Sequence, residues 1–311
     1  MQIDEELKII HAVIFSTGRG QAPWFSRLRG RDPSLHRPHH ASRDAGTPGG
    51  VRHGRLPMRA ALLLAASILI IAPAGATAPA VKAEVEAVTA FGLDVTFAPT
   101  EAGSLDEDVQ TAVTNILGAT YADVVALYPD LGAVTVEVQA IDRPAVDAIG
   151  GVTGRAQRPG VIVIEVSVTY PDGALAAVEA NLARNFYHEL HHLARGWTIE
   201  DNAFGPGIHI AAINEGLAVV FSEEMTGQAD ASGVVPDDPE AWALEIRDLP
   251  LSANYWDWMF DHPDGREAIG YRTGTWLVRQ AMANTGLSLL ELAERSPDEI
   301  WQMAGFEPRV E

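Results

Sequence analysis

The 311-residue sequence contains no cysteine. This absence excludes disulfide frameworks, thiolate zinc sites, iron–sulfur clusters and cysteine nucleophiles. The sequence also lacks the glycine-rich phosphate-binding patterns and the GxSxG turn, so nothing in it indicates nucleotide binding or α/β-hydrolase chemistry. Any metal site in this protein must therefore be built from histidine and carboxylate side chains.

Basic residues are scarce relative to acidic ones. There are 22 Lys and Arg against 42 Asp and Glu, which gives a net charge of −20. A surface that binds duplex nucleic acid needs clustered Lys and Arg for the phosphates, so we expect no nucleic-acid partner. With 47% hydrophobic and 21% charged residues, the chain has the composition of a globular protein with a sizeable core.

Long hydrophobic runs are also missing. The segment MRAALLLAASILIIAPAGATAPA starts at Met58 and combines Arg59, an apolar run over residues 60–71 and a small-x-small site ending at Ala76. A helix needs about 20 apolar residues to span a bilayer, so this run is typical of a cleaved signal peptide. We predict a signal peptide at residues 58–76 and a secreted or periplasmic protein with no stable membrane span after cleavage. An uncleaved anchor or a buried helix is the alternative.

Residues 1–57 are rich in Arg, Gly, Pro and His and have no apolar periodicity. Such a composition predicts disorder, and a signal peptide works poorly behind so long a leader. We interpret Met58 as the true start and residues 1–57 as a mis-annotated extension. Residues 77–311 then form one domain, which we expect to be a monomer.

The apolar pattern changes from strand-like to helical along residues 77–311. It predicts an α+β fold, with a small N-terminal β-sheet and helices followed by a mostly helical half. Gly150, Gly151 and Gly154 indicate a turn or loop whose backbone closely approaches another segment. The predicted strands span residues 91–97, 134–141 and 161–169, and the predicted helices span residues 105–127, 174–195, 211–225, 239–247, 265–285 and 288–294 onward.

The predicted helix at 174–195 contains the segment NFYHELHHLARG, in which His188, Glu189 and His192 form an HExxH pattern. Positions i and i+4 of a helix lie on one face, so both imidazoles can reach one zinc ion with Glu189 beside it. Zinc held by three protein ligands keeps a position for water, lowers the pKa of that water, and needs a carboxylate to take its proton.

A candidate third ligand lies downstream in AAINEGLAVVFSEEM. Glu215 is surrounded there by apolar residues on a predicted helix. Burying a carboxylate costs several kcal/mol unless it has a partner, and zinc would be that partner. An exposed carboxylate or an ion pair with Arg195 is the alternative interpretation.

The two segments HELHHLARG and INEGLAVVFSEE resemble the gluzincin metallopeptidases, and more closely the DUF2268 family of predicted Zn-dependent proteases. The resemblance covers roughly residues 134–306. It implies His188, His192 and Glu215 as zinc ligands and Glu189 as the base. One departure is Val219, which stands where thermolysin-like gluzincins carry an Asp that orients a zinc-bound His.

Two further side chains are candidates for stabilising the oxyanion of amide hydrolysis, namely Tyr271 and His209. Their alternatives are an ordinary helix aromatic and a loop or capping histidine. We interpret His191 as a core histidine or a neighbour of the ligands. Clustered aromatic side chains lie in the core more often than in a substrate subsite, and we interpret Trp256, Trp258 and Phe260 as core residues.

These residues together predict an exported zinc metallopeptidase for peptide or protein substrates. Glu189 deprotonates the zinc-bound water and returns the proton to the leaving amine. We expect the strand at 161–169 to offer an exposed edge to an extended substrate. Two alternatives stay open: a zinc-stabilised, non-catalytic binding domain closed by a fourth ligand such as His191 or His209, and a non-peptidase zinc hydrolase.

Overall fold

The computed structural model describes residues 92–307, so the interpretations of residues 1–57 and 58–76 lie outside the described residues. A four-stranded sheet has the order β1-β2-β4-β3. β1, β2 and β4 are parallel, whereas β3 runs antiparallel to β4. The strands are β1 (Leu93–Ala98), β2 (Val134–Ile141), β3 (Val152–Arg158) and β4 (Val161–Ser167).

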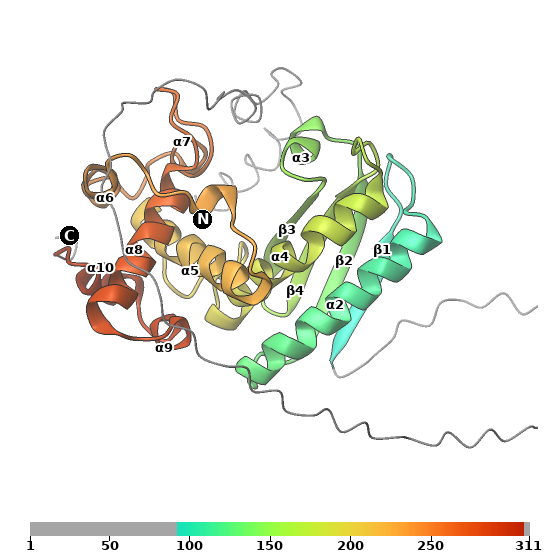
Figure 1. The fold of residues 1–311 in the computed structure, drawn as a ribbon, viewed down its shortest axis with the longest axis horizontal. Coiled ribbons are helices and arrows are strands. Elements are labelled where there is room, and N and C mark those ends of the chain that lie inside the picture. The colour runs from blue at the N-terminus through green and yellow to red at the C-terminus, as the bar shows by residue number, and fades with distance from the viewer. Residues whose placement is uncertain (1–91, 308–311) are drawn as a thin grey trace, which may run out of the picture. The chain divides into compact units, whose positions relative to one another are not determined.

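Two long helices, α2 (Glu107–Leu127) and α4 (Ala174–Arg195), pack against each other and along the sheet (Figure 1). α2 buries a row of apolar side chains at helical spacing, consistent with one face turned to the core. α4 is capped at its C-terminal end by Gly196, whose φ of 70° is a left-handed conformation that favours glycine. The helix that carries the HExxH pattern is thus held against the sheet along its length.

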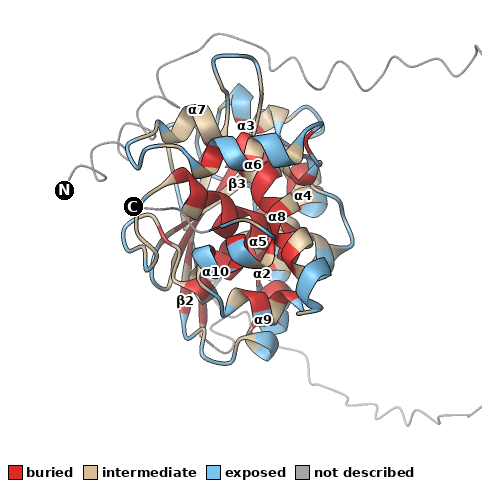
Figure 2. Cartoon of the chain, turned by 90° about the vertical axis from the view of Figure 1, so that its left-hand side faces the viewer, coloured by how far each residue is buried: buried red, intermediate tan, exposed pale blue. Residues whose placement is uncertain are grey.

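The remaining helices form the second half, apart from α3 (Pro144–Ala148), which lies between β2 and β3. α5 packs against α4, and its side chains are buried along most of its length (Figure 2). An almost fully buried helix must be surrounded by other elements. Those that follow α4 are α5 (Ile208–Thr226), η2 (Ala231–Gly233), α6 (Pro239–Arg247), α7 (Tyr255–Met259), α8 (Ile269–Thr285), α9 (Leu289–Ala293) and α10 (Pro297–Met303).

α5 and α8 cross with their backbones in contact at two glycines. A Cβ atom on Gly274 would overlap the carbonyl group of Ala212, and one on Gly216 would lie 2.6 Å from the backbone nitrogen of Thr275. Only glycine allows two helix backbones to approach this closely. Because Gly216 follows Glu215, this crossing also determines where that carboxylate lies.

The predicted α+β class is confirmed, and the bounds of α4 and α6 are as predicted. α8 begins four residues later than predicted, at Ile269, because the chain turns before it. The C-terminal helical segment is two helices, α9 and α10, each begun by a serine capping box, at Ser288 and at Ser296.

Two expectations about the sheet are wrong. Gly150 and Gly151 lie in a turn, as predicted, but Gly154 lies in the edge strand β3, which was not predicted because its residues TGRAQR carry little strand signal. The close approach that was expected there is confirmed, because a Cβ on Gly151 would lie 2.7 Å from the Ala177 side chain. β4 lies between β2 and β3 and offers no exposed edge, which agrees with the burial of both its faces.

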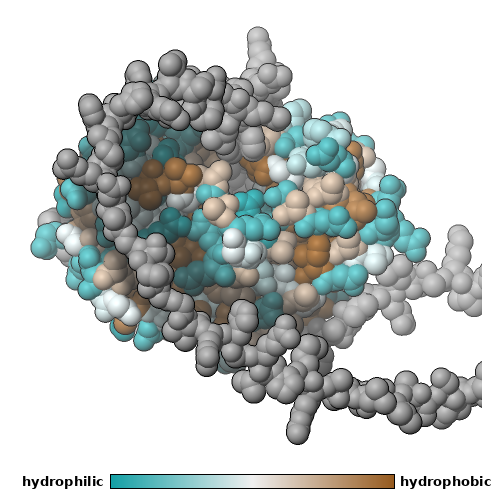
Figure 3. Space-filling model, in the orientation of Figure 1, coloured by the Kyte–Doolittle hydropathy of each residue, from teal (hydrophilic) through white to brown (hydrophobic). Residues whose placement is uncertain are grey.

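Hydrophilic residues separate the apolar patches on the face shown in Figure 3. Among residues 92–307, the large apolar side chains with exposed surface include Val234, Val235 and Leu251. No helix within this range combines the length and the apolar character needed to cross a membrane.

Candidate metal centre

Two histidines from α4 and one carboxylate from α5 converge on a single point. His188 and His192 lie one helical turn apart, with their Nε2 atoms 3.0 Å from each other. The Oε2 atom of Glu215 lies 3.1 Å from Nε2 of His188 and 3.2 Å from Nε2 of His192. His192 and Glu215 are buried, and His188 is partly exposed. The structure therefore brings together all three residues that the sequence predicted as ligands.

This donor set fits a zinc ion. Two imidazole nitrogens and one carboxylate oxygen are the ligands that open, three-residue zinc sites use. Hydrogen bonds among these atoms cannot satisfy all of them, because each contact between nitrogens needs one donor and one acceptor. A cation at the centre interacts favourably with all three lone pairs.

The charges of the three groups also favour a cation. Burial raises the pKa of Glu215, but His192 and His188 outweigh it and hold that pKa well below its ordinary value. Burial lowers the pKa of His188, while Glu215 and Glu189 more than compensate and raise it. The ionised form of Glu215 is thus stabilised by positive charge at this point, which a metal cation would supply.

Glu189 lies between α4 and the edge strand β3. A Cβ on Gly154 would lie 2.9 Å from Cγ of Glu189 and 2.5 Å from Oδ1 of Asn185, so glycine is required where this helix meets the strand. Burial raises the pKa of Glu189, although His188, His192 and a hydrogen bond with the Ala156 backbone lower it in part. A carboxylate with a raised pKa is suited to accept and release a proton near neutral pH.

Two tyrosines border the ligands. The ring of Tyr271, on α8, lies 6.5 Å from that of His188, so Tyr271 lies beside the metal ligands as the sequence predicted. The hydroxyl of Tyr255, on α7, donates a hydrogen bond of 3.4 Å to Oε1 of Glu215. Sequence reasoning missed Tyr255. The only signal was its place beside the aromatic cluster, whose rings pack against one another, Trp256 on Phe260 at 4.8 Å and Trp258 on His262 at 4.7 Å.

The other candidate histidines are not among the clustered metal donors of residues 92–307. His191 is fully buried against the ring of Phe221, at 5.1 Å, as expected of a core histidine. Burial lowers its pKa well below the ordinary value, so it is neutral. His209 lies in the first turn of α5, where its ring packs beside Gly207 and its carbonyl accepts from Trp301 at 3.1 Å.

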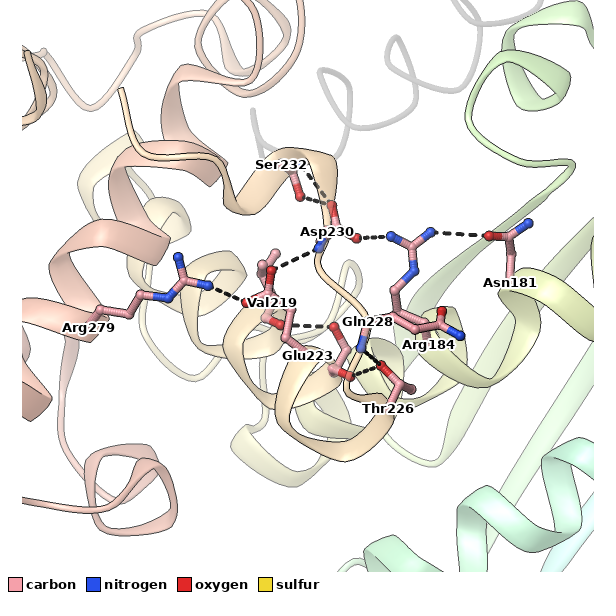
Figure 4. A network of polar contacts seen from close by, with 10 residues as sticks. Asn181, Arg184, Val219, Glu223, Thr226, Gln228, Asp230, Ser232 and Arg279 are labelled. Atoms are coloured by element: carbon pink, nitrogen blue, oxygen red, sulfur yellow. Dashed lines mark hydrogen bonds and ion pairs between the residues drawn. The ribbon is translucent and has the colours of Figure 1, made fainter. Parts of the chain in front are cut away.

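A polar network fastens the segment after α5 next to the ligand helix (Figure 4). Nη1 of Arg184, one turn before His188, lies 2.6 Å from Oδ2 of Asp230. The Asp230 amide donates to Glu223 at 2.8 Å, and Arg279 pairs with Glu223. The charge of Asp230 contributes to the raised pKa of His188. This network places the carboxylate of Asp230 near His188. Val219, which stands where thermolysin-like gluzincins carry an Asp, provides no such group.

A second polar contact joins α4 to α5 beside the ligands. Nε of Arg195 donates to Oδ1 of Asn214 at 2.9 Å, and both side chains are buried. The remaining guanidinium nitrogens donate to the carbonyl groups of Ala293 and Arg295. Arg195 thus pairs with backbone and amide groups rather than with Glu215, the alternative partner considered from the sequence.

Comparison with known proteins gives one family. The family model described as "Predicted Zn-dependent protease (DUF2268)" matches residues 140–302, more than half of the chain. The match includes all three converging side chains and Glu189. No curated protein and no solved structure gives a significant match. The chain therefore belongs to the DUF2268 family of predicted Zn-dependent proteases.

Proposed function

We propose that the protein is a zinc metallopeptidase that hydrolyses peptide bonds, with His188, His192 and Glu215 as the metal ligands. The observation that carries this proposal is the convergence of three donor atoms beside the buried Glu189. A zinc ion bound there would supply a Lewis acid and an acidified water. The family description supports zinc dependence.

The protein groups then have separate roles. Glu189 accepts a proton from the attacking water and later donates it to the nitrogen of the leaving amine. Tyr271 donates its hydroxyl hydrogen to the oxyanion that forms on the former carbonyl. Burial and the Glu215 charge raise its pKa well above the ordinary value, so this hydroxyl stays protonated; it hydrogen-bonds to Glu215 in this structure and would turn to the oxyanion when that forms. His209 is a weaker candidate for that role because it packs at the start of α5.

The edge strand next to the site is β3 rather than β4, and we propose that an extended substrate lies along it. The carbonyl of Ala156 points outward, where it accepts from Ile199 at 3.0 Å. Outward-pointing groups alternate along a strand, so the N–H and C=O of Gly154 face the same side. Because Ile199 already occupies the edge at Ala156, strand addition at Gly154 would bring a substrate backbone next to Glu189.

The test compares purified wild-type protein with Glu189→Gln, in zinc content and in cleavage of a mixed peptide library. We expect both proteins to bind about one zinc, and only the wild type to cut, because Gln cannot accept the proton. A chelator should abolish cleavage and added zinc should restore it. If both proteins bind zinc and neither cuts, the metal is structural or the substrate is not a peptide.

The alternative of a metal site closed by a fourth ligand finds no support in His191 or His209, which lie outside the donor cluster.

Export and assembly belong to the same proposal. We propose that residues 58–76 direct export to the periplasm or the medium, and that the processed protein is a monomer without a membrane span. N-terminal sequencing of the secreted protein should begin at residue 77, and light scattering should give the mass of one chain. A mature protein that begins before Met58, or a stable dimer, contradicts these points.

A further inference from the structure

The two oxygens of the Glu215 carboxylate have different partners. Oε2 faces the two histidine nitrogens, at 3.1 and 3.2 Å. Oε1 accepts from the hydroxyl of Tyr255 at 3.4 Å. One oxygen is therefore directed to the metal position and the other to a hydrogen-bond donor from a different helix.

Tyr255 is held in place by its own surroundings. It is the first residue of α7, whose start is capped by Asn254, which accepts from the amides of Trp256 and Asp257. The Tyr255 ring lies 6.3 Å from that of Phe260. A tyrosine hydroxyl is protonated at neutral pH, so Tyr255 is the donor in its contact with Glu215.

The number of carboxylate oxygens that bind a metal affects the room left for water. A carboxylate can bind through one oxygen or through both, and binding through both adds a bond at the metal. Catalytic zinc sites keep a position for water beside three protein ligands. A donor that engages the outer oxygen and restricts rotation of the carboxylate favours binding through one oxygen. Partners of this kind tune metal sites in general.

We propose that Tyr255 is a positioning residue that holds Glu215 in one-oxygen coordination of the metal and so keeps a coordination position open for water. The inference rests on the metal site of the proposed function. It assigns a role to α7 beyond the packing of its aromatic side chains. Tyr255 touches a ligand rather than the substrate, so its effect passes through Glu215.

The experiment compares the wild type with Tyr255→Phe, which removes the hydroxyl and keeps the ring. The matched control is Tyr121→Phe, which removes a hydroxyl that donates to the carbonyl of Gly132 at 2.6 Å, outside the metal centre. Zinc affinity is measured by competition with a chelating dye. The visible spectrum of the Co²⁺-substituted protein reports the coordination number.

We expect Tyr255→Phe to bind zinc about 10- to 100-fold more weakly than the wild type. Its Co²⁺ absorption should shift and weaken, as expected for a higher coordination number. Tyr121→Phe should match the wild type in both measurements. An unchanged Co²⁺ spectrum in Tyr255→Phe overturns the inference, whatever happens to the affinity.

Failure of the inference and failure of the proposed function are distinguishable. If the wild type binds neither zinc nor Co²⁺, the metal site itself is wrong and the inference falls with it. If the wild type binds metal but cuts no peptide, the peptidase proposal fails. In that case a changed Co²⁺ spectrum in Tyr255→Phe still supports the role of Tyr255, because this readout needs no substrate.

Discussion

At the scale of single residues, the close packing of α4 on β3 at Gly154 fixes the position of Glu189. Gly154 allows α4 to lie against β3 so closely that a Cβ atom would reach Glu189 and Asn185. The sequence indicated a close approach at this glycine, but not what it approached. The reason is that Glu189 lies far from Gly154 in the sequence, and only the packing of α4 on the sheet brings the two together.

The change Gly154→Ala should reduce catalysis more than stability. The added methyl group displaces Glu189, and a misplacement of about 1 Å can cost about 100-fold in rate. We expect kcat to fall by about that factor while zinc content is retained. The control is Gly118→Ala in α2, where a Cβ meets no atom within 4 Å. That change should leave kcat unaltered and stabilise the helix by about 1 kcal/mol. Equal kcat in both variants would contradict the assigned position of Glu189.

At the scale of elements, the position of Glu215 depends on how α5 packs against α4 and α8. The crossing of α5 and α8 requires glycine at positions 216 and 274 for packing alone, so Gly216 and Gly274 need no explanation from catalysis. The segment after α5 is fastened to α4 through the pair between Arg184 and Asp230. Both arrangements lead to predictions about folding as well as about the metal.

Gly274→Ala should be more destabilising than an ordinary small-to-large change. Overpacking a core typically costs about 1–3 kcal/mol, and here the obstacle is the backbone of Ala212, which no side-chain rotation can relieve. We expect the loss to reach or exceed the upper end of that range. Urea denaturation measures it, with Gly118→Ala as control, and zinc affinity should fall together with stability. A variant as stable as the wild type would show that the two backbones are farther apart than described.

The pair between Asp230 and Arg184 should give a pH-dependent contribution to stability. Burial raises the pKa of Asp230, but Ser232 and Arg184 outweigh it and lower the pKa below the ordinary value. An acid whose pKa is lower in the folded state contributes stability above its unfolded pKa of about 3.9, and loses it as the pH falls through the folded value. We expect Asp230→Asn to cost about 1.5–3 kcal/mol at pH 7.

The measurement follows unfolding of the wild type and Asp230→Asn between pH 7 and pH 3, both in chelator so that metal loss does not contribute. The difference between the two proteins should be constant at neutral pH and should shrink below about pH 4. A difference that stays the same down to pH 3 would mean that the charge of Asp230 is not what stabilises the segment.

At the scale of the whole molecule, Arg195 connects α4, which carries His188 and His192, to the C-terminal helices. Its guanidinium group reaches Asn214 on α5 and two carbonyl groups at the end of α9, and it stacks on Phe204 at 4.7 Å. Burial lowers its pKa to about 10, so it stays charged at neutral pH. One side chain thus holds together segments about a hundred residues apart.

Arg195→Lys should destabilise the fold although the charge is kept, because an ammonium group cannot reproduce the planar set of donors. We expect a loss of about 1–3 kcal/mol for each acceptor that is left unpaired. Urea denaturation gives the loss, and Arg247→Lys, which alters an exposed pair with Asp248, serves as control and should differ little from the wild type. Equal stability of the two variants would argue against a connecting role for Arg195.

Local sequence patterns suffice to predict the α+β class, the bounds of α4 and the identity of the three converging side chains. These depend on local periodicity and on spacing within one helix, which neighbouring residues encode directly. The position of β3 at the edge, the central position of β4 and the contact of Tyr255 with Glu215 follow instead from tertiary packing. Strand order and contacts between distant elements depend on which segments pack together. A five-residue helix such as α7 or a glycine-containing strand such as β3 is too short or too weakly patterned to indicate that packing.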